Sequence, residues 1–455
     1  MPEVKNNVRS SALDLGRVHY LERGNKELII DRINGRWVML PHGASVLLPL
    51  INLPQGSVSN LDLQDRVNQL TQILTNRGIG SANAVEHNSL NTVILKLTKA
   101  CNLGCTYCYD FEHEDKARHQ QINITLDAIR QAIDMADGRV NFILHGGEPM
   151  LVWDMIRTLV TSGYAYAMAK NVEVYFIGQT NLTRLTREIV DFSFKNDIRW
   201  GVSIDGPPGI NNRFRVRHNG TGSHDLMMEA IHRYPEFVRR SNAMSTITLA
   251  NHDRLLEVAK YIQKLGFSGW DWTLFQAIGR GRDIDRFDYD IDVLIRSWDD
   301  LFAAVVDGNF DGFPIEPILK YLRNFLDGPV NNMCMRSKCG AARDLLSVSF
   351  DGTIEACDCI DPCSSMAHIG NMKDGGLTQA YASSKADLIR SRNVEKLQCG
   401  SCLWQAVCGG TCMARAGGIE KISKDECQMS MHVFDRISSS IAQSDALIRY
   451  RKSCD

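Results

Sequence analysis

The sequence predicts an α/β protein built on a partial barrel of six strand–helix units, with a small unit before it and a cysteine-rich region after it. Between residues 91 and 310, mostly apolar strand-like segments alternate with amphipathic helical segments, which is the pattern of a parallel sheet covered by helices. Eleven of the 14 cysteines lie in the last 122 residues, which marks a separate region. A chain of 455 residues is also too long for one small core.

The barrel prediction depends on six strands and the helices between them. We expect strands at Thr92–Leu97, Val140–His145, Val172–Gly178, Arg199–Ile204, Ala243–Leu249 and Gly269–Phe275. The helical segments between them are Leu126–Met135, Asp154–Met168, Thr186–Phe194, Asp225–Val238 and Arg254–Leu265. Six units are fewer than the eight of a closed barrel, so we predict an open, TIM-like partial barrel over residues 91–310. Such sheets bind ligands at the carboxyl ends of their strands.

Residues 1–90 form a separate unit in this interpretation. Short strands are expected at Val18–Leu21, Glu27–Arg32 and Arg36–Leu40, and Asn34-Gly35 is a strong hairpin signal. Helical patterns follow at Ala44–Leu50 and Leu61–Asn76, and the polar stretch Ser81–Ser89 is a predicted linker. Three strands followed by helices resemble the PqqD-like winged-helix element that grips leader peptides of ribosomally made natural products. An ordinary N-terminal cap on the next domain is the alternative.

The chain after the barrel divides into a bridge and a cysteine-rich domain. The bridge, residues 311–333, contains a helical segment at Ile315–Phe325. In residues 334–455 the regular elements are short, so we expect metal clusters to replace a conventional core. A final helix is predicted at Met431–Tyr450.

Composition limits the classes of function. A formal net charge of -2 gives no reason to expect nucleic-acid binding. The sequence contains no apolar run of about 18 residues, so we expect no membrane span. The polar segment Met1–Arg17 lacks the apolar core of a secretory signal. We therefore expect a cytoplasmic protein whose clustered cysteines bind metal. The alternative, cysteines that act as small buried hydrophobes, suits isolated ones such as Cys454.

The loop after the first strand of the barrel carries three cysteines, Cys101, Cys105 and Cys108, at spacing C-x3-C-x2-C. Three thiolates hold three irons of a 4Fe–4S cluster, whereas complete protein ligation needs four. The fourth iron is therefore left for another ligand. A zinc knuckle is the alternative, and it needs a fourth ligand such as His113 or His119.

This loop, with Tyr107 just before its third cysteine, resembles the radical S-adenosylmethionine (SAM) superfamily. The resemblance implies that SAM chelates the fourth iron and that Tyr107 contacts its adenine side. The second strand ends in His145-Gly146-Gly147-Glu148-Pro149, which is similar to the family's GGEP motif. Its glycines let the backbone approach the cofactor, and Glu148 accepts a hydrogen bond from the cofactor's ammonium group.

Two further strand ends agree with this resemblance. The third strand ends in Gln179-Thr180-Asn181, where Asn181 is a candidate ribose or methionine contact, or simply a helix cap. The fourth ends in Ser203-Ile204-Asp205-Gly206-Pro207, followed by Arg215 and Gly220-Thr221-Gly222. This run resembles maturases with a SPASM extension, in which the serine and arginine bind the cofactor's carboxylate. The family's usual His-Asp is replaced by Asn211-Asn212, so Arg213 and Arg217 are rivals of Arg215.

The C-terminal cysteines resemble the SPASM arrangement. Eight thiolates complete two four-cysteine sites. By resemblance, one auxiliary 4Fe–4S cluster is held by Cys334, Cys339, Cys357 and Cys412, and the other by Cys399, Cys402, Cys408 and Cys427. A pair of zinc sites is the alternative for the C-x2-C part. Three cysteines, Cys359, Cys363 and Cys454, are left unassigned, and we expect them to be structural or incidental.

Asp358 directly follows Cys357. In sulfatase-maturing relatives an aspartate at the matching position acts as general base, and a nearby anionic cluster raises the pKa of a carboxyl group. The alternative is a solvated loop residue.

These features together predict a radical SAM/SPASM peptide maturase with three 4Fe–4S clusters. The cofactor supplies a radical that takes a hydrogen from a ribosomal precursor peptide, and an intramolecular crosslink follows, a C–C cyclophane at an aromatic residue. Thioether-forming, lysine–tryptophan-linking and sulfatase-maturing enzymes fit the same motifs, although the last usually begin near their first cysteine motif. An iron–sulfur electron carrier or scaffold is an alternative of another class, but it gives no reason for Gly146-Gly147-Glu148-Pro149. The expected partners are a peptide with a leader sequence and an electron donor such as flavodoxin or ferredoxin.

Overall fold

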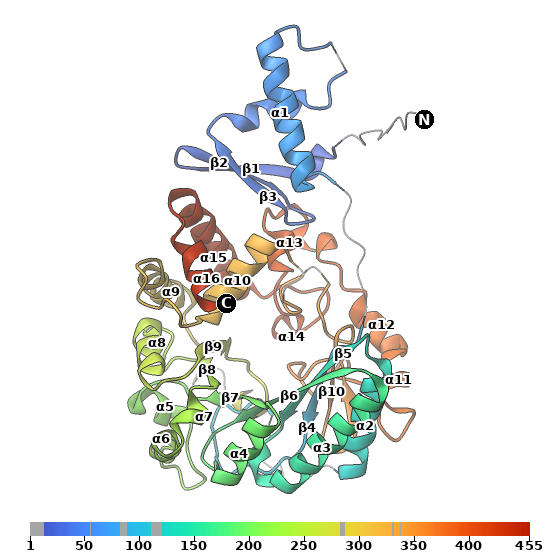
Figure 1. The fold of residues 1–455 in the computed structure, drawn as a ribbon, viewed down its shortest axis with the longest axis vertical. Helices are drawn as coiled ribbons and strands as arrows, with labels where there is room; N and C mark the ends of the chain where they lie inside the picture. The colour runs from blue at the N-terminus through green and yellow to red at the C-terminus, as the bar shows by residue number, and fades with distance from the viewer. Residues whose placement is uncertain are drawn as a thin grey trace, which may run out of the picture.

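In the described part of the chain, a nine-stranded sheet lies in the lower half of the view in Figure 1. The computed structural model describes residues 13–54, 56–81, 89–110, 121–282, 287–329, 332–336 and 338–455. Six strands follow one another in chain order and run parallel: β4 (Thr92–Lys96), β5 (Arg139–His145), β6 (Glu173–Thr180), β7 (Arg199–Ser203), β8 (Ser241–Ile247) and β9 (Gly269–Leu274). The predicted six-unit partial barrel is confirmed.

Helices cover the outer face of this sheet (Figure 1). They are α2 (Ile122–Met135), α3 (Trp153–Lys170), α4 (Arg187–Lys195), α5 (Pro208–Phe214), α6 (His224–Arg233), α7 (Pro235–Val238) and α8 (Leu255–Lys264). The segment predicted as one helix, Asp225–Val238, is divided between α6 and α7. The division falls at Pro235, which lacks the N–H that a continuing helix needs.

The C-terminal region adds three strands to the same sheet. β10 (Leu345–Val348) pairs in parallel with β4, and the antiparallel strands β11 (Thr353–Glu355) and β12 (His368–Asn371) continue the sheet beyond it. The side chains of Leu346, Val348 and Ile354 are fully buried in the main hydrophobic core. The expectation that clusters replace a conventional core was therefore wrong for these strands.

Helices after the barrel pack beside the cysteine-rich region. They are α9 (Ile291–Val306), α10 (Glu316–Asp327), α11 (Gly376–Tyr381), α12 (Ser384–Arg390), α13 (Gln405–Cys408), α14 (Met413–Ala416), α15 (Lys424–Gln443) and α16 (Ala446–Cys454). The predicted bridge helix is α10. The predicted final helix is two helices, because Ser444 adopts an extended conformation and ends α15. α15 begins earlier than predicted, where the hydroxyl of Ser423 accepts a hydrogen bond from Glu426 N.

The N-terminal unit has its own three-stranded sheet and a small hydrophobic cluster of its own. Strands β1 (Val18–Arg23), β2 (Lys26–Asp31) and β3 (Trp37–Pro41) form an antiparallel sheet, followed by η2 (Ala44–Leu50) and α1 (Leu61–Arg77). The first of these helices is a 3-10 helix containing Pro49. Most of the predicted linker, 81–89, lies outside the described residues.

This unit lies against α10, α13 and α15 (Figure 1). The ring of Trp37 stacks on Phe325 with centroids 4.6 Å apart, and its indole Nε1 donates to the Phe325 carbonyl. Arg32 donates to the side chain of Gln405 at 3.0 Å, and Ala406 N donates to the carbonyl of Arg32 at 3.2 Å. The N-terminal unit is thus docked on the cysteine-rich region.

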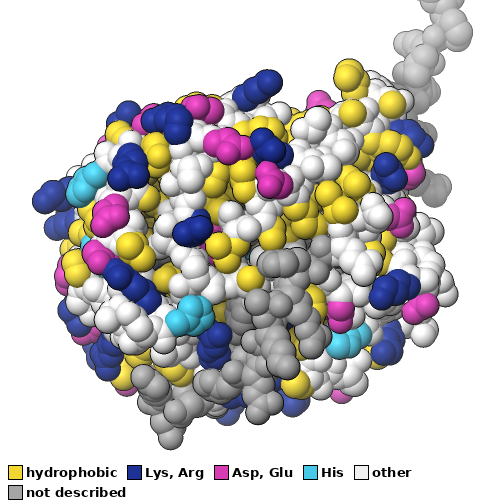
Figure 2. Space-filling view, turned by 90° about the horizontal axis from the view of Figure 1, so that it is seen from below, with side chains coloured by type: hydrophobic (Ala, Val, Ile, Leu, Met, Phe, Trp, Pro, Cys, Tyr) yellow, Lys and Arg dark blue, Asp and Glu magenta, His cyan; other side chains and the backbone are white. Residues whose placement is uncertain are grey.

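The described surface agrees with the near-neutral composition. On the face shown in Figure 2, Lys and Arg side chains lie among Asp and Glu side chains. In the described part of the chain, no helix combines the length and apolar character needed to cross a bilayer.

Candidate functional site

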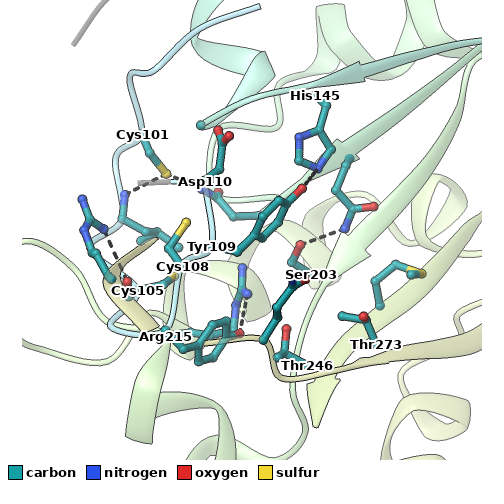
Figure 3. Close-up of a pocket in the computed structure, with 18 of the residues that line it drawn as sticks. Cys101, Cys105, Cys108, Tyr109, Asp110, His145, Ser203, Arg215, Thr246 and Thr273 are labelled. Carbon is teal, nitrogen blue, oxygen red and sulfur yellow. Dashed lines mark hydrogen bonds between the residues drawn. The ribbon is translucent and has the colours of Figure 1, made fainter. Parts of the chain in front are cut away.

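A cavity of about 320 Å³ opens at the carboxyl ends of the barrel strands (Figure 3). Its walls come from the cysteine loop after β4, the ends of β5 to β9 and the segment after β11. Figure 3 shows Cys101, Cys105 and Cys108 together on one side, with Ser203 and Thr273 at strand ends on the other. The cavity therefore lies where the sequence predicts a ligand.

The cysteine loop is held against the chain that follows β7. Gly104 N donates to the Val216 carbonyl at 2.8 Å, and Thr106 N donates to the Phe214 carbonyl at 3.0 Å. Burial raises the pKa of Cys101 and of Cys108 to about 12. Without a cation these thiols stay protonated, whereas iron would hold them as thiolates. The alternative zinc ligands His113 and His119 lie outside the described residues.

The two glycines of the GGEP motif line the cavity. Gly146 has φ 121°, and a Cβ there would lie 2.5 Å from the Thr98 carbonyl oxygen, so only glycine fits. Glu148 is fully buried, and its carboxylate accepts hydrogen bonds from Met150 N, Asn181 N and the hydroxyl of Thr180. Burial raises its pKa. Glu148 thus joins the ends of β5 and β6, and its contact with a cofactor ammonium group stays a prediction.

Asn181 and Ser203 both line the cavity. The amide nitrogen of Asn181 donates to Asn102 in the cysteine loop at 3.0 Å. The hydroxyl of Ser203 accepts from Gln179 Nε2 at 2.8 Å. Both side chains present polar atoms beside the cysteines.

Arg215 is the buried member of the three candidate arginines. Arg213 is exposed and Arg217 pairs with Asp225 at the surface, whereas Arg215 is only 7% exposed and lines the cavity. Its Nη1 donates to the hydroxyl of Tyr107 at 2.8 Å, and that hydroxyl donates to Asp205 at 2.6 Å. Its Nε is buried with no partner among the described residues.

A donor left free on a buried guanidinium fits the carboxylate of SAM. Asn211 and Asn212, which depart from the family pattern, support this loop. Asn211 accepts from Asp205 N at 3.2 Å, and Asn212 accepts from His224 N at 3.0 Å.

A hydrogen-bonded group of three side chains lies across the cavity. The hydroxyl of Tyr109 donates to Asp358 at 3.1 Å and lies 3.3 Å from Nε2 of His145. Burial and the nearby Asp358 raise the pKa of Tyr109, so its hydroxyl stays a donor. The sequence predicted Asp358 but missed Tyr109 and His145, although each directly adjoins a predicted motif.

Comparisons with known proteins agree with this geometry. Residues 95–265 match the family model of the Radical SAM superfamily. The chain contains a radical SAM domain. It is homologous to a cysteine-type anaerobic sulfatase-maturating enzyme of Clostridium novyi (strain NT), with 23% identity over 339 residues that cover 71% of this chain and 88% of the relative.

Two solved structures share the fold of this radical SAM enzyme. Native anSMEcpe with bound AdoMet and Kp18Cys peptide has a TM-score of 0.68 and 20% identity, covering 78% of this chain and 99% of its own. Streptococcus suis SuiB bound to precursor peptide SuiA has a TM-score of 0.56 and 14% identity, covering 90% and 98%. The radical SAM assignment makes the chain an enzyme, so the electron-carrier alternative is no longer needed.

Behind the radical SAM cavity, Lys96 links two cysteine-bearing segments. Its Nζ lies 3.3 Å from Asp110, which follows Cys108, and 3.1 Å from Glu355, which precedes Cys357. Lys96 is 4% exposed, and its two carboxylate partners raise its pKa although burial opposes the rise. This ion network fixes the segment of Asp358 beside the first cysteine loop.

The first predicted auxiliary site gathers five thiols rather than four. Burial and the neighbouring thiols of Cys339, Cys412 and Cys359 raise the pKa of Cys334, so Cys412 lies near this group. The fifth thiol belongs to Cys359, which was expected to be structural or incidental. It lines the cavity, and its Sγ lies within 4.8 Å of the ligand atoms of Cys357 and Asp358.

The second predicted site gathers Cys399, Cys402, Cys408 and Cys427. Burial and the other three thiols raise the pKa of Cys399 to about 11. These residues suit a complete four-cysteine site. Of the remaining cysteines, Cys363 lies 3.3 Å from a guanidinium nitrogen of Arg282, and Cys454 ends α16 against the core.

Proposed function

We propose that this radical SAM enzyme is a peptide maturase that abstracts a hydrogen atom from a precursor peptide and installs an intramolecular crosslink. The observation that supports it is one cavity that joins the three-cysteine loop, the free donor of Arg215 and the carboxylate of Asp358. Three 4Fe–4S clusters belong to this proposal, one at Cys101, Cys105 and Cys108 and one at each auxiliary site.

The protein's own residues position the reactants in this proposal. Bound SAM and its cluster supply the radical chemistry. Arg215 and Ser203 bind the carboxylate of SAM, the glycine wall and Glu148 bind its ammonium group, and Asn181 and Tyr107 contact the nucleoside. Asp358, held by Tyr109, would accept the proton that the substrate loses. The cysteines of the first auxiliary site would hold a cluster able to take the electron. A flavodoxin or ferredoxin supplies the first electron.

Two candidate reactions differ in the product that they form. We propose a crosslink, specifically a cyclophane at an aromatic residue, because the N-terminal unit has three strands followed by helices, as in leader-gripping elements. The peptide-bound SuiB neighbour also covers 90% of the chain, against 78% for anSMEcpe. Conversion of a cysteine or serine to formylglycine is the second candidate, favoured by the sulfatase-maturating relatives and by Asp358 after Cys357.

Cofactor cleavage tests the enzyme class. Reduced, reconstituted protein given SAM alone should release 5′-deoxyadenosine, and Cys105→Ala should abolish that product. Cys399→Ala should retain part of the cleavage while losing modified peptide. A fully loaded protein that releases no 5′-deoxyadenosine would sink the proposal.

Asp358→Asn tests the base. It should leave cofactor cleavage intact and lower peptide turnover by about 100-fold, within the range of general-base catalysis. Glu395→Gln, an exposed carboxylate in the same region, is the matched control and should have no effect. Equal turnover in both variants would reject the role of Asp358.

The product identifies the bond. Mass spectrometry of a precursor peptide encoded beside the gene should show a loss of two hydrogens for a crosslink, and a formylglycine residue would favour the second candidate. Removing residues 1–90 should weaken binding of the peptide. Unchanged binding would reject leader recognition by the N-terminal unit.

A further inference from the structure

Arg392 is a buried arginine with two hydrogen-bond donors left over. It lies between α12 and the short helix η6 (Val394–Lys396) and is 3% exposed. Its Nη2 donates to the carbonyls of Gly410 and Lys421 at 2.8 and 3.2 Å. Its Nε and Nη1 are buried and have no partner among the described residues.

Such an arrangement is costly without a partner outside the polypeptide. A buried cation is stable only when it is paired, and buried N–H groups are almost always hydrogen-bonded. Within the described ranges, no carboxylate forms an ion pair with Arg392. Arg415, near the first auxiliary site, differs because Glu426 neutralises it. The free donors of Arg392 therefore point to an anionic ligand beside them.

The second auxiliary site lies next to this guanidinium. Gly410, whose carbonyl holds Arg392, approaches Cys399 so closely that a Cβ on Gly410 would lie 3.5 Å from the cysteine's Sγ. Four thiolates around an iron–sulfur cluster form an anion of the required kind.

We propose that Arg392 donates hydrogen bonds from Nε and Nη1 to the cluster held by Cys399, Cys402, Cys408 and Cys427, and thereby raises its reduction potential. Reduction adds a negative charge to this cluster, so a fixed cation with two donors stabilises the reduced form more than the oxidised form. The inference rests on the proposed function, because it requires the second auxiliary cluster.

A potentiometric titration of the reconstituted protein, followed by electron paramagnetic resonance, tests this role. Arg392→Met removes the charge and the donors. In this variant we expect the oxidised-to-reduced ratio of the second cluster to rise at least tenfold, measured at the potential where the same cluster of the intact protein is half reduced. For a one-electron couple, a tenfold rise corresponds to a reduction potential lower by 59 mV. Arg392→Lys keeps the charge but loses the two free N–H groups, and it should lower the potential by less. The other two clusters should not change.

Lys396→Met is the matched control. Lys396 is exposed, lies three residues before Cys399 and carries the same charge. Because solvent screens an exposed charge, we expect a ratio change below threefold. An equal shift in Lys396→Met, or an unchanged potential in Arg392→Lys, would overturn the role of Arg392. If Arg392→Met does not assemble its clusters, the Arg392→Lys titration decides.

Iron and sulfide analysis distinguishes a failure of the second auxiliary cluster from a failure of the role of Arg392. Cys399→Ala should contain iron and sulfide for one cluster fewer than the intact protein, and equal contents would contradict the second auxiliary site and with it the role of Arg392. Three clusters with unchanged potentials in both Arg392 variants contradict the role of Arg392 alone.

Discussion

At the residue scale, Arg215 offers the most direct test of the cavity. Arg215→Lys keeps a positive charge but cannot present both Nη1 to Tyr107 and a free Nε to a carboxylate. Losing one hydrogen bond to a charged group costs about 1.5–3 kcal/mol, so the Kd for SAM should rise about 10–100-fold. Isothermal titration calorimetry of the anaerobic protein measures it. Arg213→Lys, at an exposed position, is the control, and equal affinities in the two variants would contradict carboxylate recognition by Arg215.

Only some of the residues that line the cavity could be predicted from the sequence. The three loop cysteines, the two glycines and Arg215 belong to local motifs, so their meeting at the strand ends follows from a parallel sheet. The contact between Tyr109 and Asp358 joins positions 249 residues apart, and no local pattern encodes it. The place of Cys359 in the cavity could not be predicted for the same reason, because it depends on how the segment after β11 packs.

At the scale of an element, Glu27 ties β2 to the turn that precedes η2. Its carboxylate accepts hydrogen bonds from Gly43 N and Ser45 N, both at 2.7 Å, and it is 2% exposed. Burial opposes the effect, but these two N–H groups lower the pKa of Glu27. Glu27→Gln should destabilise the N-terminal unit by about 1–3 kcal/mol at pH 7, because one N–H loses its acceptor. Hydrogen exchange of the β2 amides measures this loss.

The pH dependence of this effect has a definite sign. Since the folded pKa lies below the unfolded value of about 4.3, the stabilisation by Glu27 is complete above that pH. This stabilisation is lost as the pH falls through the lower folded pKa. The intact protein and Glu27→Gln should therefore become more alike in stability at acid pH. Glu22→Gln is the control, because exposed Glu22 pairs directly opposite Glu27. A loss in Glu22→Gln as large as in Glu27→Gln would contradict the assignment.

Helices and strands were predicted correctly where their sequence pattern is long. The predictions failed where the pattern is short or interrupted. The mostly apolar segments of β4 to β9, alternating with helical segments, predicted parallel strands covered by helices. β10 to β12 have only three or four residues each, and their strand character depends on the open edge of β4, far away in sequence. The single helix expected at Asp225–Val238 ignored Pro235, which local chemistry could have corrected.

At the scale of the whole molecule, distant parts of the chain meet around the cysteines. β10 places the segment of Cys357 beside the first cysteine loop by pairing with β4. The N-terminal unit packs on α13, which ends in Cys408. Neither arrangement was predictable, because both depend on surfaces that exist only after each part has folded.

Trp37 is the residue expected to hold the N-terminal unit in place. Trp37→Ala removes the ring that stacks on Phe325 and the donor to its carbonyl, a central aromatic contact worth about 2 kcal/mol or more. The amide of Ala406, which donates to Arg32 across this interface, should then exchange its hydrogen faster. Cleavage of SAM without peptide should stay unchanged, since the cavity lies in the barrel, whereas peptide turnover should fall if the docked unit presents the leader.

Tyr20→Ala is the control for Trp37→Ala. It removes a ring that is 52% exposed on the same sheet, so the amide of Ala406 should stay protected from exchange. Unchanged exchange at Ala406 in Trp37→Ala would mean that other contacts hold the unit. Arg32 and Arg23, whose Nε donates to the hydroxyl of Ser438 in α15 at 3.0 Å, would then be the residues to vary.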